Sequence, residues 1–589
     1  MPTSASTMQP GLAPEASPEN LYDLVAGAVR TSPHRVAVGT ADGKLELSYR
    51  ELDVAVREFA IRLARLGVGP GDMIALSCDN SMEFVLTLLA AASIGVAVAP
   101  LDPALPASGL ASRVAAVRAR TVIVAAHLYD GSMAAQLAGR CQVWQVEASR
   151  SGTSVRAVIT VPGGSAAPLA AAHPVPGGAA LLLSTAGSTS APKVVPLTVA
   201  NVAASVRGIQ ATYRLGPEDA TLLVMPLYHG HGLIAGLLAT LASGGAAWLP
   251  EARRFSASRF WTEMVAVGAT WYTAVPTIHQ ILLERAAAEY PWENPPRLRF
   301  IRSCSAPLAP AVFRQLEAEF SVPVVSAYGM TETAHQAASN PLPGSGPVKP
   351  GSVGIGTGVE VQIVSPNGRV VAPGTHGEIC VRGPAVASGY LDDPANTDRS
   401  FTGGWFHTGD LGYQDADGYL FLTGRSKELI NRGGEKFSPQ QIDAVLLSNA
   451  KVQDALSFGV LDEKYGEEIN AAVILKPGQQ AEESDLKDYS RTQLGAAGMP
   501  KRIFFVSKFP LTAKKVGDRR KLAARLAAGE SPAFLRRRVS LGSSRTGGAS
   551  MMKEYVSQER KEGSCMTGWL TGRPRTRHQG AWRFAIGCS

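Results

Sequence analysis

Residues 184–198, STAGSTSAPKVVPLT, are the stretch that decides how the rest of the chain is interpreted. They follow an apolar run and place small, hydroxylated residues ahead of a proline and a lysine. Gly187 lets the backbone turn tightly, and Lys193 adds a positive charge. Hydroxyl donors come from Thr185, Ser188 and Thr189. The stretch therefore predicts a loop that binds nucleotide phosphates, with a polar surface loop as the alternative.

This loop lacks the spacing G-x-x-x-x-G-K-[S/T], so the usual P-loop fold is not predicted. Helical spacing of apolar residues over 21–30 and 49–67 alternates with β-rich stretches at 73–80 and 96–103. Such alternation predicts an α/β fold with parallel layers. The Ser-, Gly-, Ala- and Pro-rich residues 146–178 predict an exposed connection.

The length and composition of the chain limit its class. With 589 residues, 45% of them hydrophobic, it suits one large domain and one smaller domain. No apolar run is long enough for a membrane span. The six cysteines show no C-x-x-C spacing, which argues against a zinc site or a disulfide framework and favours a reducing compartment.

The formal net charge of +8 lies in the C-terminal part of the chain. Residues 531–589 carry eleven Lys and Arg against three Glu, so the remaining residues are close to neutral. We therefore expect no nucleic-acid binding by the body of the protein. A protein anchored through this basic tail, with the fold as a carrier, stays an alternative.

Short motifs follow the loop in a fixed order over about 250 residues, a span read from the sequence. They are PLYHGHG (226–232), SAP (305–307), YGMTE (328–332), TGD (408–410) and GRSKE (424–428). Loop and motifs together resemble the adenylate-forming enzymes, which include acyl-CoA synthetases, luciferases and peptide-synthetase adenylation domains. The loop departs from the pattern T-S-G-T-T-G-x-P-K-G at four positions, Ala186, Ser188, Ser190 and Val194.

The resemblance implies a large N-terminal domain of layered α/β subdomains and a small, mobile C-terminal α/β domain. We expect a disordered tail at 1–16, the AMP-binding domain at 17–424 and a hinge at 425–427. The C-terminal domain is expected at 428–528 and a basic disordered tail at 529–589. The glycine-rich segment 422–439 is expected to be a mobile linker.

The same resemblance assigns nucleotide-binding roles. Glu332 is expected to hold the Mg²⁺ that bridges the ATP phosphates. Tyr328 is expected to stack on adenine opposite Ala306 and Pro307. Asp410 is expected to bind the ribose, with Arg425 as its partner. The other expected ligand-binding or hinge residues are Gly329 and Thr331 near the nucleotide, Lys427 at the hinge, and Gly433 and Gly434 beside the CoA channel. A solvated Glu, a turn Asp and a surface Arg are the structural alternatives.

A narrower resemblance covers about residues 22–528, on segments such as RSCSAPLAP, GWFHTGD and KELINRGGEKFSP. These segments are similar to the oxalate-CoA ligases of plants and fungi. The residues that match the small polar acyl pocket of that group are His229, His231, Ser305 and His335. A second carboxylate buried beside the reacting one needs hydrogen-bond donors, which imidazole and hydroxyl groups supply. Histidines satisfied within the core are the alternative.

The candidate catalytic residues are Lys193, His229 and Lys515. The family pattern P-x-T-x-x-G-K-[I/V]-x-R-R aligns with PLTAKKVGDRR at 510–520. An alignment without gaps places Val516 at the position of the catalytic lysine. A one-residue shift in an extended segment turns side chains to the other face, so Lys515 enters the site only if Gly517 permits a bulge. A lost catalytic lysine is the alternative.

The sequence therefore predicts an AMP-forming acid-CoA ligase that uses ATP, Mg²⁺ and CoA and activates a small dicarboxylic acid, with oxalate as the first choice. A weakened nucleotide-binding relative, and a ligase for another short or aromatic acid, stay open. We expect a monomer in the cytoplasm. A peroxisomal protein is the alternative, although the chain ends Gly587-Cys588-Ser589 and not in S-K-L.

Overall fold

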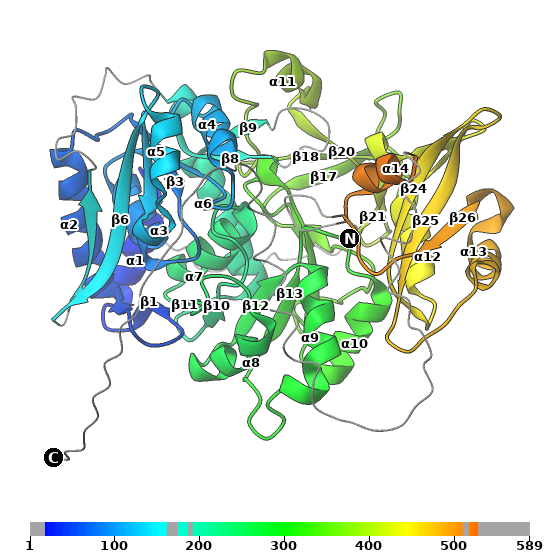
Figure 1. The fold of residues 1–589 in the computed structure, drawn as a ribbon, viewed down its shortest axis with the longest axis horizontal. Coiled ribbons are helices and arrows are strands. Elements are labelled where there is room, and N and C mark those ends of the chain that lie inside the picture. Colours follow the sequence, from blue (N-terminus) through cyan, green and yellow to red (C-terminus); the bar gives the residue numbers. More distant parts are fainter. Residues whose placement is uncertain (1–17, 153, 162–174, 186–192, 511–516, 528–589) are drawn as a thin grey trace, which may run out of the picture. The chain divides into compact units, whose positions relative to one another are not determined.

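The computed structural model describes residues 18–152, 154–161, 175–185, 193–510 and 517–527. In this part of the chain the strands form four sheets (Figure 1). The expected α/β fold is thereby confirmed. The tails at 1–16 and 529–589, loop residues Gly187, Ser188 and Thr189, and the candidate catalytic Lys515 lie outside the described residues.

The first sheet is mainly parallel, with antiparallel strands at its edges. In spatial order its strands are β7 (Ser154–Thr160), β6 (Gln142–Ser151), β5 (Thr121–Ala125), β3 (Met73–Ser77), β4 (Ala97–Pro100), β8 (Ala179–Ser184) and β9 (Val194–Thr198). Successive side chains point to opposite faces. Ala75 and Val122 therefore pack with α4 (Ala107–Ala116) and α5 (Gly131–Leu137), while Ile74 and Ile123 belong to the core that includes α2 (Tyr49–Arg65) and α3 (Met82–Ser93).

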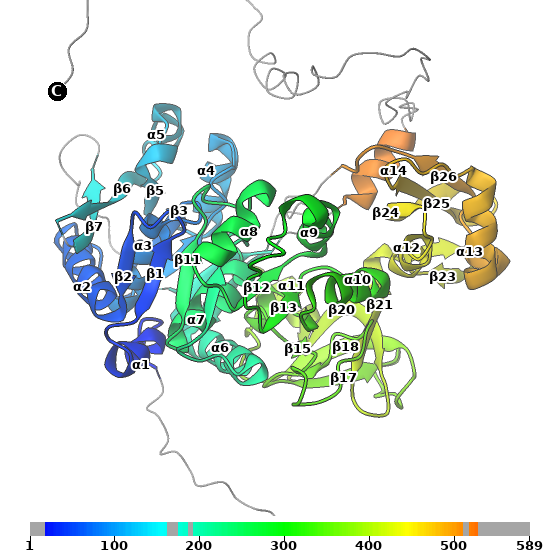
Figure 2. The same cartoon turned by 90° about the horizontal axis from the view of Figure 1, so that it is seen from below.

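The second sheet carries most of the candidate site. In spatial order its strands are β16 (Ile355–Gly356), β15 (Ala338–Ser339), β14 (Val324–Tyr328), β13 (Phe300–Ser303), β12 (Trp271–Ala274), β10 (Ala220–Leu222), β11 (Ala246–Leu249), β1 (Val36–Thr40) and β2 (Glu46–Ser48). Strands β1 and β11 lie side by side although they are distant in sequence (Figure 2). The adjacent strands β10, β12, β13 and β14 of this sheet are parallel to one another.

Helices cover this second sheet on both faces. Trp271 and Phe300 pack in the core shared with α6 (Val199–Tyr213), the π-helix η3 (His231–Leu238) and α7 (Ala239–Ala242). Their neighbours Tyr272 and Ile301 pack with α8 (Ala257–Ala266), α9 (Pro276–Glu289) and α10 (Pro310–Phe320). A sheet buried on both faces leaves the ends of its strands as the places where polar groups reach solvent or a ligand.

A third, antiparallel sheet packs on the end of β14. It comprises β17 (Glu360–Val364), β18 (Gly377–Arg382), β20 (Trp405–Gln414), β19 (Phe401–Thr402) and β21 (Leu420–Arg425). Its Ile363, Ile379 and Leu420 share a core with Tyr328. The remaining short elements of this large domain are α1 (Asp23–Thr31), η1 (Ala126–Leu128), η2 (Pro176–Gly178), η4 (Thr331–Thr333) and α11 (Pro394–Ser400).

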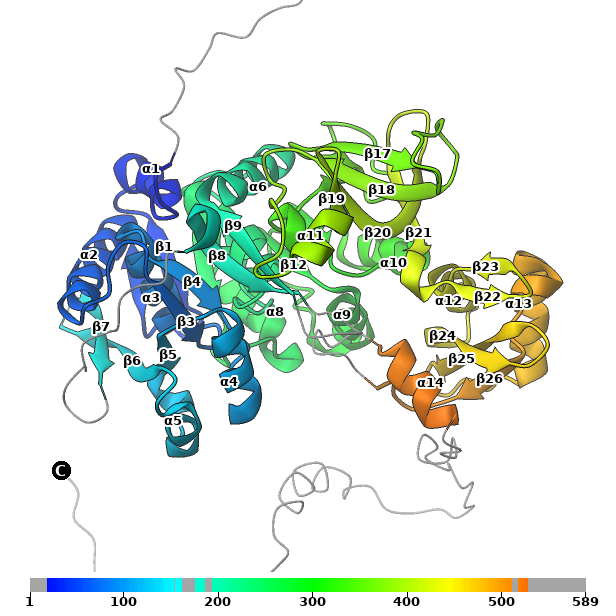
Figure 3. The same ribbon diagram turned by 90° about the horizontal axis from the view of Figure 1, so that it is seen from above.

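The C-terminal domain has its own sheet and two small cores. Its strands are β22 (Ile430–Arg432), β23 (Glu435–Phe437), β24 (Val452–Asp462), β25 (Gly466–Leu475) and β26 (Arg502–Phe505). Ile469 and Val473 face α12 (Pro439–Leu447) and α13 (Glu483–Gly498), whereas Ala472 faces α14 (Arg519–Ala527) (Figure 3). The helices therefore cover opposite faces of this sheet.

One expectation about a connecting segment was wrong. Residues 146–160 do not form an exposed connection, because β6 and β7 pair as an antiparallel hairpin in which Val155 and Ala157 are buried. Their alternation with Ser154 and Arg156 is that of a half-buried strand, which the biased composition obscured. Residues 422–439 contain the end of β21, the 3-10 turn η5 (Ser426–Glu428), β22 and β23, and their role as a mobile linker stays a prediction.

His279 on α9 makes the stability of the fold depend on pH. The side chain is fully buried, and burial lowers its pKa from 6.5 to about 4. Between these values the unfolded chain binds one proton more than the folded chain, so this contribution to the free energy of unfolding is present above pH 6.5 and falls as the pH falls.

We expect His279→Gln to flatten the acid side of the stability profile. The pH-dependent loss that His279 causes should reach about 3 kcal/mol near pH 4. Urea unfolding between pH 7.5 and 4.5 measures it, with His34→Gln as a control at an exposed histidine. Identical pH slopes for the wild type and His279→Gln would contradict this account.

Candidate active site

The two described ends of the phosphate loop are held together at its base. The backbone N–H of Thr185 donates to the carbonyl oxygen of Lys193 over 2.8 Å, continuing the pairing of β8 and β9. The Lys193 ammonium lies 3.9 Å from the centroid of the Tyr390 ring. The Tyr390 hydroxyl in turn donates to Oε1 of Glu332 over 2.9 Å. The structure thus brings the candidate Lys193 and the candidate Glu332 to one place.

Opposing effects act on the Lys193 ammonium. Partial burial is the largest and lowers its pKa, the Glu332 carboxylate raises it, and the neighbouring Lys427 lowers it again, with a net lowering. Glu332 sits on η4 beside Thr331, and its backbone carbonyl accepts from the N–H of Ala387 over 2.8 Å. An ammonium and a carboxylate held this way form a polarised surface suited to phosphate and metal.

The second cluster centres on Asp410, which is 6% exposed. Tyr328 donates its hydroxyl to Oδ2 of Asp410 over 2.7 Å, and Nε of Arg425 lies 2.8 Å from Oδ1. Asp410 and Arg425 face each other in the register of β20 and β21, so the sheet itself fixes the pair. Burial raises the pKa of Asp410, against the lowering effects of Arg425 and Tyr328.

Glu378 holds the irregular part of β20 that presents Asp410. Its Oε1 accepts from the N–H of Gly409 over 3.0 Å, and its Oε2 lies 3.1 Å from Nδ1 of His407. The Cys380 thiol lies 3.4 Å from the same nitrogen. Gly409 has φ 71°, a left-handed conformation that glycine adopts without strain. The sequence TGD therefore forms a bulge in β20 that Glu378 stabilises.

The segments after β13 and β14 approach each other closely. A Cβ atom on Gly329 would lie 1.5 Å from the carbonyl oxygen of His335, so only glycine fits there. Ser305 and His335 have φ of 72° and 86°, conformations that are costly for residues other than glycine. Ala306 and Pro307 follow Ser305 and are half-buried and exposed, respectively. Their stacking on adenine stays a prediction.

Three of the four candidate acyl-pocket residues come together. Nδ1 of His231 lies 3.0 Å from Oγ of Ser305, and the rings of His231 and His335 stack with centroids 5.0 Å apart. Both rings are buried, at 3% and 5% exposed. His229 lies just before η3, half-buried, with its ring 4.6 Å from that of Tyr228. The π-helix that begins at His231 fits a pattern seen at functional sites.

The imidazole of His231 is neutral. Burial is the largest effect and lowers its pKa well below the usual value, and the adjacent His335 and Arg302 lower it further. Arg302 and Tyr390 were not predicted from the sequence. Arg302 is fully buried and lies within hydrogen-bond distance of both His231 and His335. The only available signal was a charged residue inside the apolar strand FIRS, and Tyr390 had none.

The candidate hinge and CoA-channel residues lie at the start of the C-terminal domain. Lys427 is exposed on η5, where Oε2 of its neighbour Glu428 accepts from Nε2 of Gln440 over 2.6 Å. Gly433 and Gly434 form the turn between β22 and β23 with φ of 62° and 89°. A glycine turn on a short hairpin presents backbone with no side chain to block an approaching ligand.

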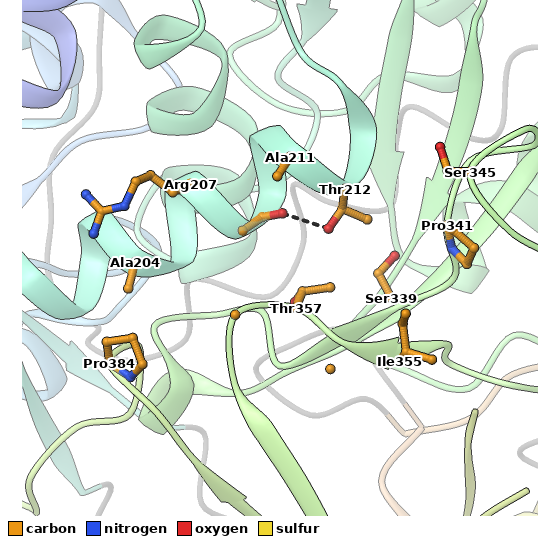
Figure 4. A pocket seen from close by; sticks show the side chains of 13 residues that line it. Ala204, Arg207, Ala211, Thr212, Ser339, Pro341, Ser345, Ile355, Thr357 and Pro384 are labelled. Atoms are coloured by element: carbon orange, nitrogen blue, oxygen red, sulfur yellow. Dashed lines mark hydrogen bonds between the residues drawn. The ribbon is translucent and has the colours of Figure 1, made fainter. Parts of the chain in front are cut away.

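A pocket of about 450 Å³ opens between α6 and the segment around β15 and β16 (Figure 4). Arg207 and Thr212 line it from α6, and Ser339 and Thr357 line it from the other side. Oγ of Ser339 lies 2.7 Å from the Tyr213 hydroxyl, and Oγ1 of Thr357 accepts from Nε2 of Gln336 over 3.2 Å. The pocket wall is thereby connected to the polar network around Arg302.

Comparison with known proteins agrees with this geometry. The family described as AMP-binding enzyme matches residues 25–391, and the AMP-binding enzyme C-terminal domain matches residues 441–515. The oxalate–CoA ligase of Arabidopsis thaliana is 44% identical over 511 residues, which cover 86% of this chain and 98% of that protein. The oxalate–CoA ligase of Saccharomyces cerevisiae is 44% identical over 346 residues, covering 58% of this chain and 62% of its own.

A solved structure gives the same result for the fold. The crystal structure of ATP-bound MatB from Rhodopseudomonas palustris superposes with a TM-score of 0.76 at 28% identity. The match covers 87% of this chain and all of that one (100%). The extent of these matches, with the ordered motifs and the clusters around Glu332 and Asp410, shows that the chain belongs to the AMP-binding enzyme family.

Proposed function

We propose that this protein is an ATP-dependent, AMP-forming acid-CoA ligase that activates oxalate. The observation that carries the proposal is the cluster of buried His231 and His335 with the exposed Ser305, which offers polar groups and lies next to a buried guanidinium. A fatty or aromatic acid would bring apolar surface to this cluster and leave its polar groups without partners. The similarity to two oxalate–CoA ligases supports the same acid.

In the first half-reaction, a carboxylate oxygen of the acid attacks the α-phosphorus of ATP and pyrophosphate leaves. Lys193, with Thr185 at the base of the loop, binds the phosphates and lowers the repulsion between the two anions. His229, which precedes η3 and adds to burial in lowering the pKa of His231, is proposed as a further contact of the acid. Asp410 accepts from the ribose hydroxyls, with its charge and orientation held by Arg425 and Tyr328.

Glu332 fits a magnesium ion because Tyr390 engages one carboxylate oxygen and Lys193 lies close by. A single carboxylate suits Mg²⁺, which takes its other ligands from phosphate and water. When bound, this ion neutralises charge on the phosphates. Tyr390 orients the Glu332 carboxylate and shields it from solvent on the side of Oε1.

In the second half-reaction, the CoA thiolate attacks the acyl carbonyl, the acyl–phosphate bond breaks and AMP leaves. The proposed hinge is at Lys427, and the glycine turn at Gly433 and Gly434 is proposed to border the CoA path. Lys515 is proposed as the lysine that assists adenylate formation. Among the described residues, no helix is long and apolar enough to cross a membrane. We propose a cytoplasmic monomer, which light scattering after size exclusion tests.

Oxalate should give the fastest pyrophosphate release among short acids. We expect a kcat/KM for oxalate at least ~10²-fold above those for acetate, glyoxylate and cinnamate, because a site built from hydrogen-bonding groups rejects ligands that leave them unpaired. Pyrophosphate release with Mg·ATP over a panel of acids measures this. Equal or faster release with a fatty or cinnamic acid would refute oxalate as the substrate.

Glu332→Gln should lower adenylate formation by at least ~10²-fold, because the charge that holds the metal is lost while the shape stays. ATP binding measured without metal should change little. Tyr390→Phe is the matched control, since it removes the hydrogen bond to Glu332 but leaves the carboxylate, and a smaller loss is expected. Near-normal turnover of Glu332→Gln would show that Glu332 is not the metal ligand.

A further inference from the structure

Arg302 is a buried charge in the middle of a hydrophobic sheet. It lies on β13, two residues after Phe300, so both side chains point to the face that η3 covers. Its partner in the register of β12 is Thr273. The residue is 0% exposed, which is rare for arginine.

Every hydrogen-bonding direction of the guanidinium is occupied, and none of these partners is a carboxylate. Nε donates to the Tyr213 hydroxyl over 2.9 Å. Nη1 donates to Thr273 Oγ1 over 2.9 Å and lies 3.3 Å from Nε2 of His231. Nη2 donates to Gln336 Oε1 over 2.9 Å and lies 3.1 Å from Nε2 of His335. The five N–H groups of arginine are thus directed at hydroxyl, amide and imidazole acceptors.

In the part of the chain that the structure describes, no Asp or Glu forms an ion pair with the Arg302 guanidinium. Other arginines that are less buried than Arg302 have such a partner. Arg299, three residues earlier, pairs with Asp219 at 2.6 Å, and Arg432 pairs with Glu468 at 3.0 Å. A buried charge without a counterion costs several kcal/mol, on the order of the penalty for breaking a buried ion pair. Hydrogen bonds to neutral groups offset part of this cost and leave the charge unbalanced.

The guanidinium also influences the proton positions of the two imidazoles. Because arginine only donates, its contacts favour tautomers in which Nε2 of His231 and Nε2 of His335 accept, and Thr273 Oγ1, 2.6 Å from Nε2 of His231, can donate to the same nitrogen. Nδ1 of His231 faces Ser305, the exposed end of the cluster. The two rings therefore present N–H donors away from Arg302.

We infer that Arg302 is a positioning residue for substrate specificity, and that the second carboxylate of the acid is the counterion which the protein itself lacks. Arg302 acts through His231 and His335, whose donors it directs at that carboxylate. This inference rests on the proposed function and extends it to a residue outside the sequence motifs. A dicarboxylate balances the buried charge, whereas a monocarboxylate leaves it unbalanced.

Gln336→Glu tests the charge directly, because it places a carboxylate of almost the same shape 2.9 Å from Nη2 of Arg302. An internal counterion should raise the KM for oxalate by at least ~10-fold, as competing charge pairs do. The melting temperature should not fall, and the shift produced by Mg·ATP should be kept. Gln336→Met removes the same amide without adding charge and should raise KM much less. Equal KM values for the wild type and Gln336→Glu, or equal increases in both variants, would overturn the inference.

Arg302→Lys keeps the positive charge at this position and Arg302→Met removes it, so the two variants separate the effect of the charge on substrate preference from the effect of changing the side chain. The lysine variant should keep the preference for oxalate over glyoxylate at a raised KM, and the methionine variant should lose at least ~10-fold of that preference. Arg299→Lys is the matched control at a paired arginine and should leave the preference unchanged. If the wild type itself shows no preference for oxalate, the proposed function fails. If the wild type prefers oxalate and Arg302→Met keeps the full preference, only the inference fails.

Discussion

The candidate site depends on a parallel sheet that is buried on both faces. Strands β12, β13 and β14 have helices on either side, so their side chains alternate between two hydrophobic cores. The polar groups needed for chemistry are concentrated where these strands end, as in other open α/β sheets. Ser305 and Tyr328 lie at or just after two such ends, and the close approach of Gly329 to His335 joins the following segments.

Two electrostatic environments are kept apart in this arrangement. At the nucleotide end, opposite charges face each other, with Lys193 near Glu332 and Arg425 paired with Asp410. At the acyl end, the positively charged Arg302 donates to hydroxyl and amide groups and to no carboxylate. The first environment is close to balanced before substrates arrive, whereas the second is balanced by an anionic ligand. Selectivity for a small dianion follows from this difference.

The sequence predicted the α/β fold and many of the residues that cluster in the structure. The alternating helical and β-rich patterns were sufficient for the class, and ordered motifs pointed to Lys193, Glu332, Asp410 and the histidines. The pairing of strands that are distant in sequence, such as β1 with β11, could not be predicted because no local sequence pattern indicates it. The hairpin of β6 and β7 was missed because composition outweighed the period-two pattern of Val155 and Ala157.

Arg302 was missed for a different reason. A single charged residue in an apolar strand has many local explanations, and only the three-dimensional structure shows that none of its hydrogen-bond partners is a carboxylate. Tyr390 was missed because its contacts with Lys193 and Glu332 join segments far apart in sequence. Site residues that belong to sequence motifs can therefore be predicted from the sequence. The charges that surround them depend on contacts that only the folded chain makes.

The central claim is that the positive charge for the second carboxylate is already present in the protein. Calorimetric titration of oxalate into the enzyme with Mg²⁺ and a non-hydrolysable ATP analogue, in buffers of different ionisation enthalpy, measures protons taken up on binding. With Arg302 as the charge and neutral imidazoles as donors, the account predicts uptake close to zero at pH 7.5. Uptake of about one proton per oxalate would contradict it, because a histidine would then have to acquire the charge on binding.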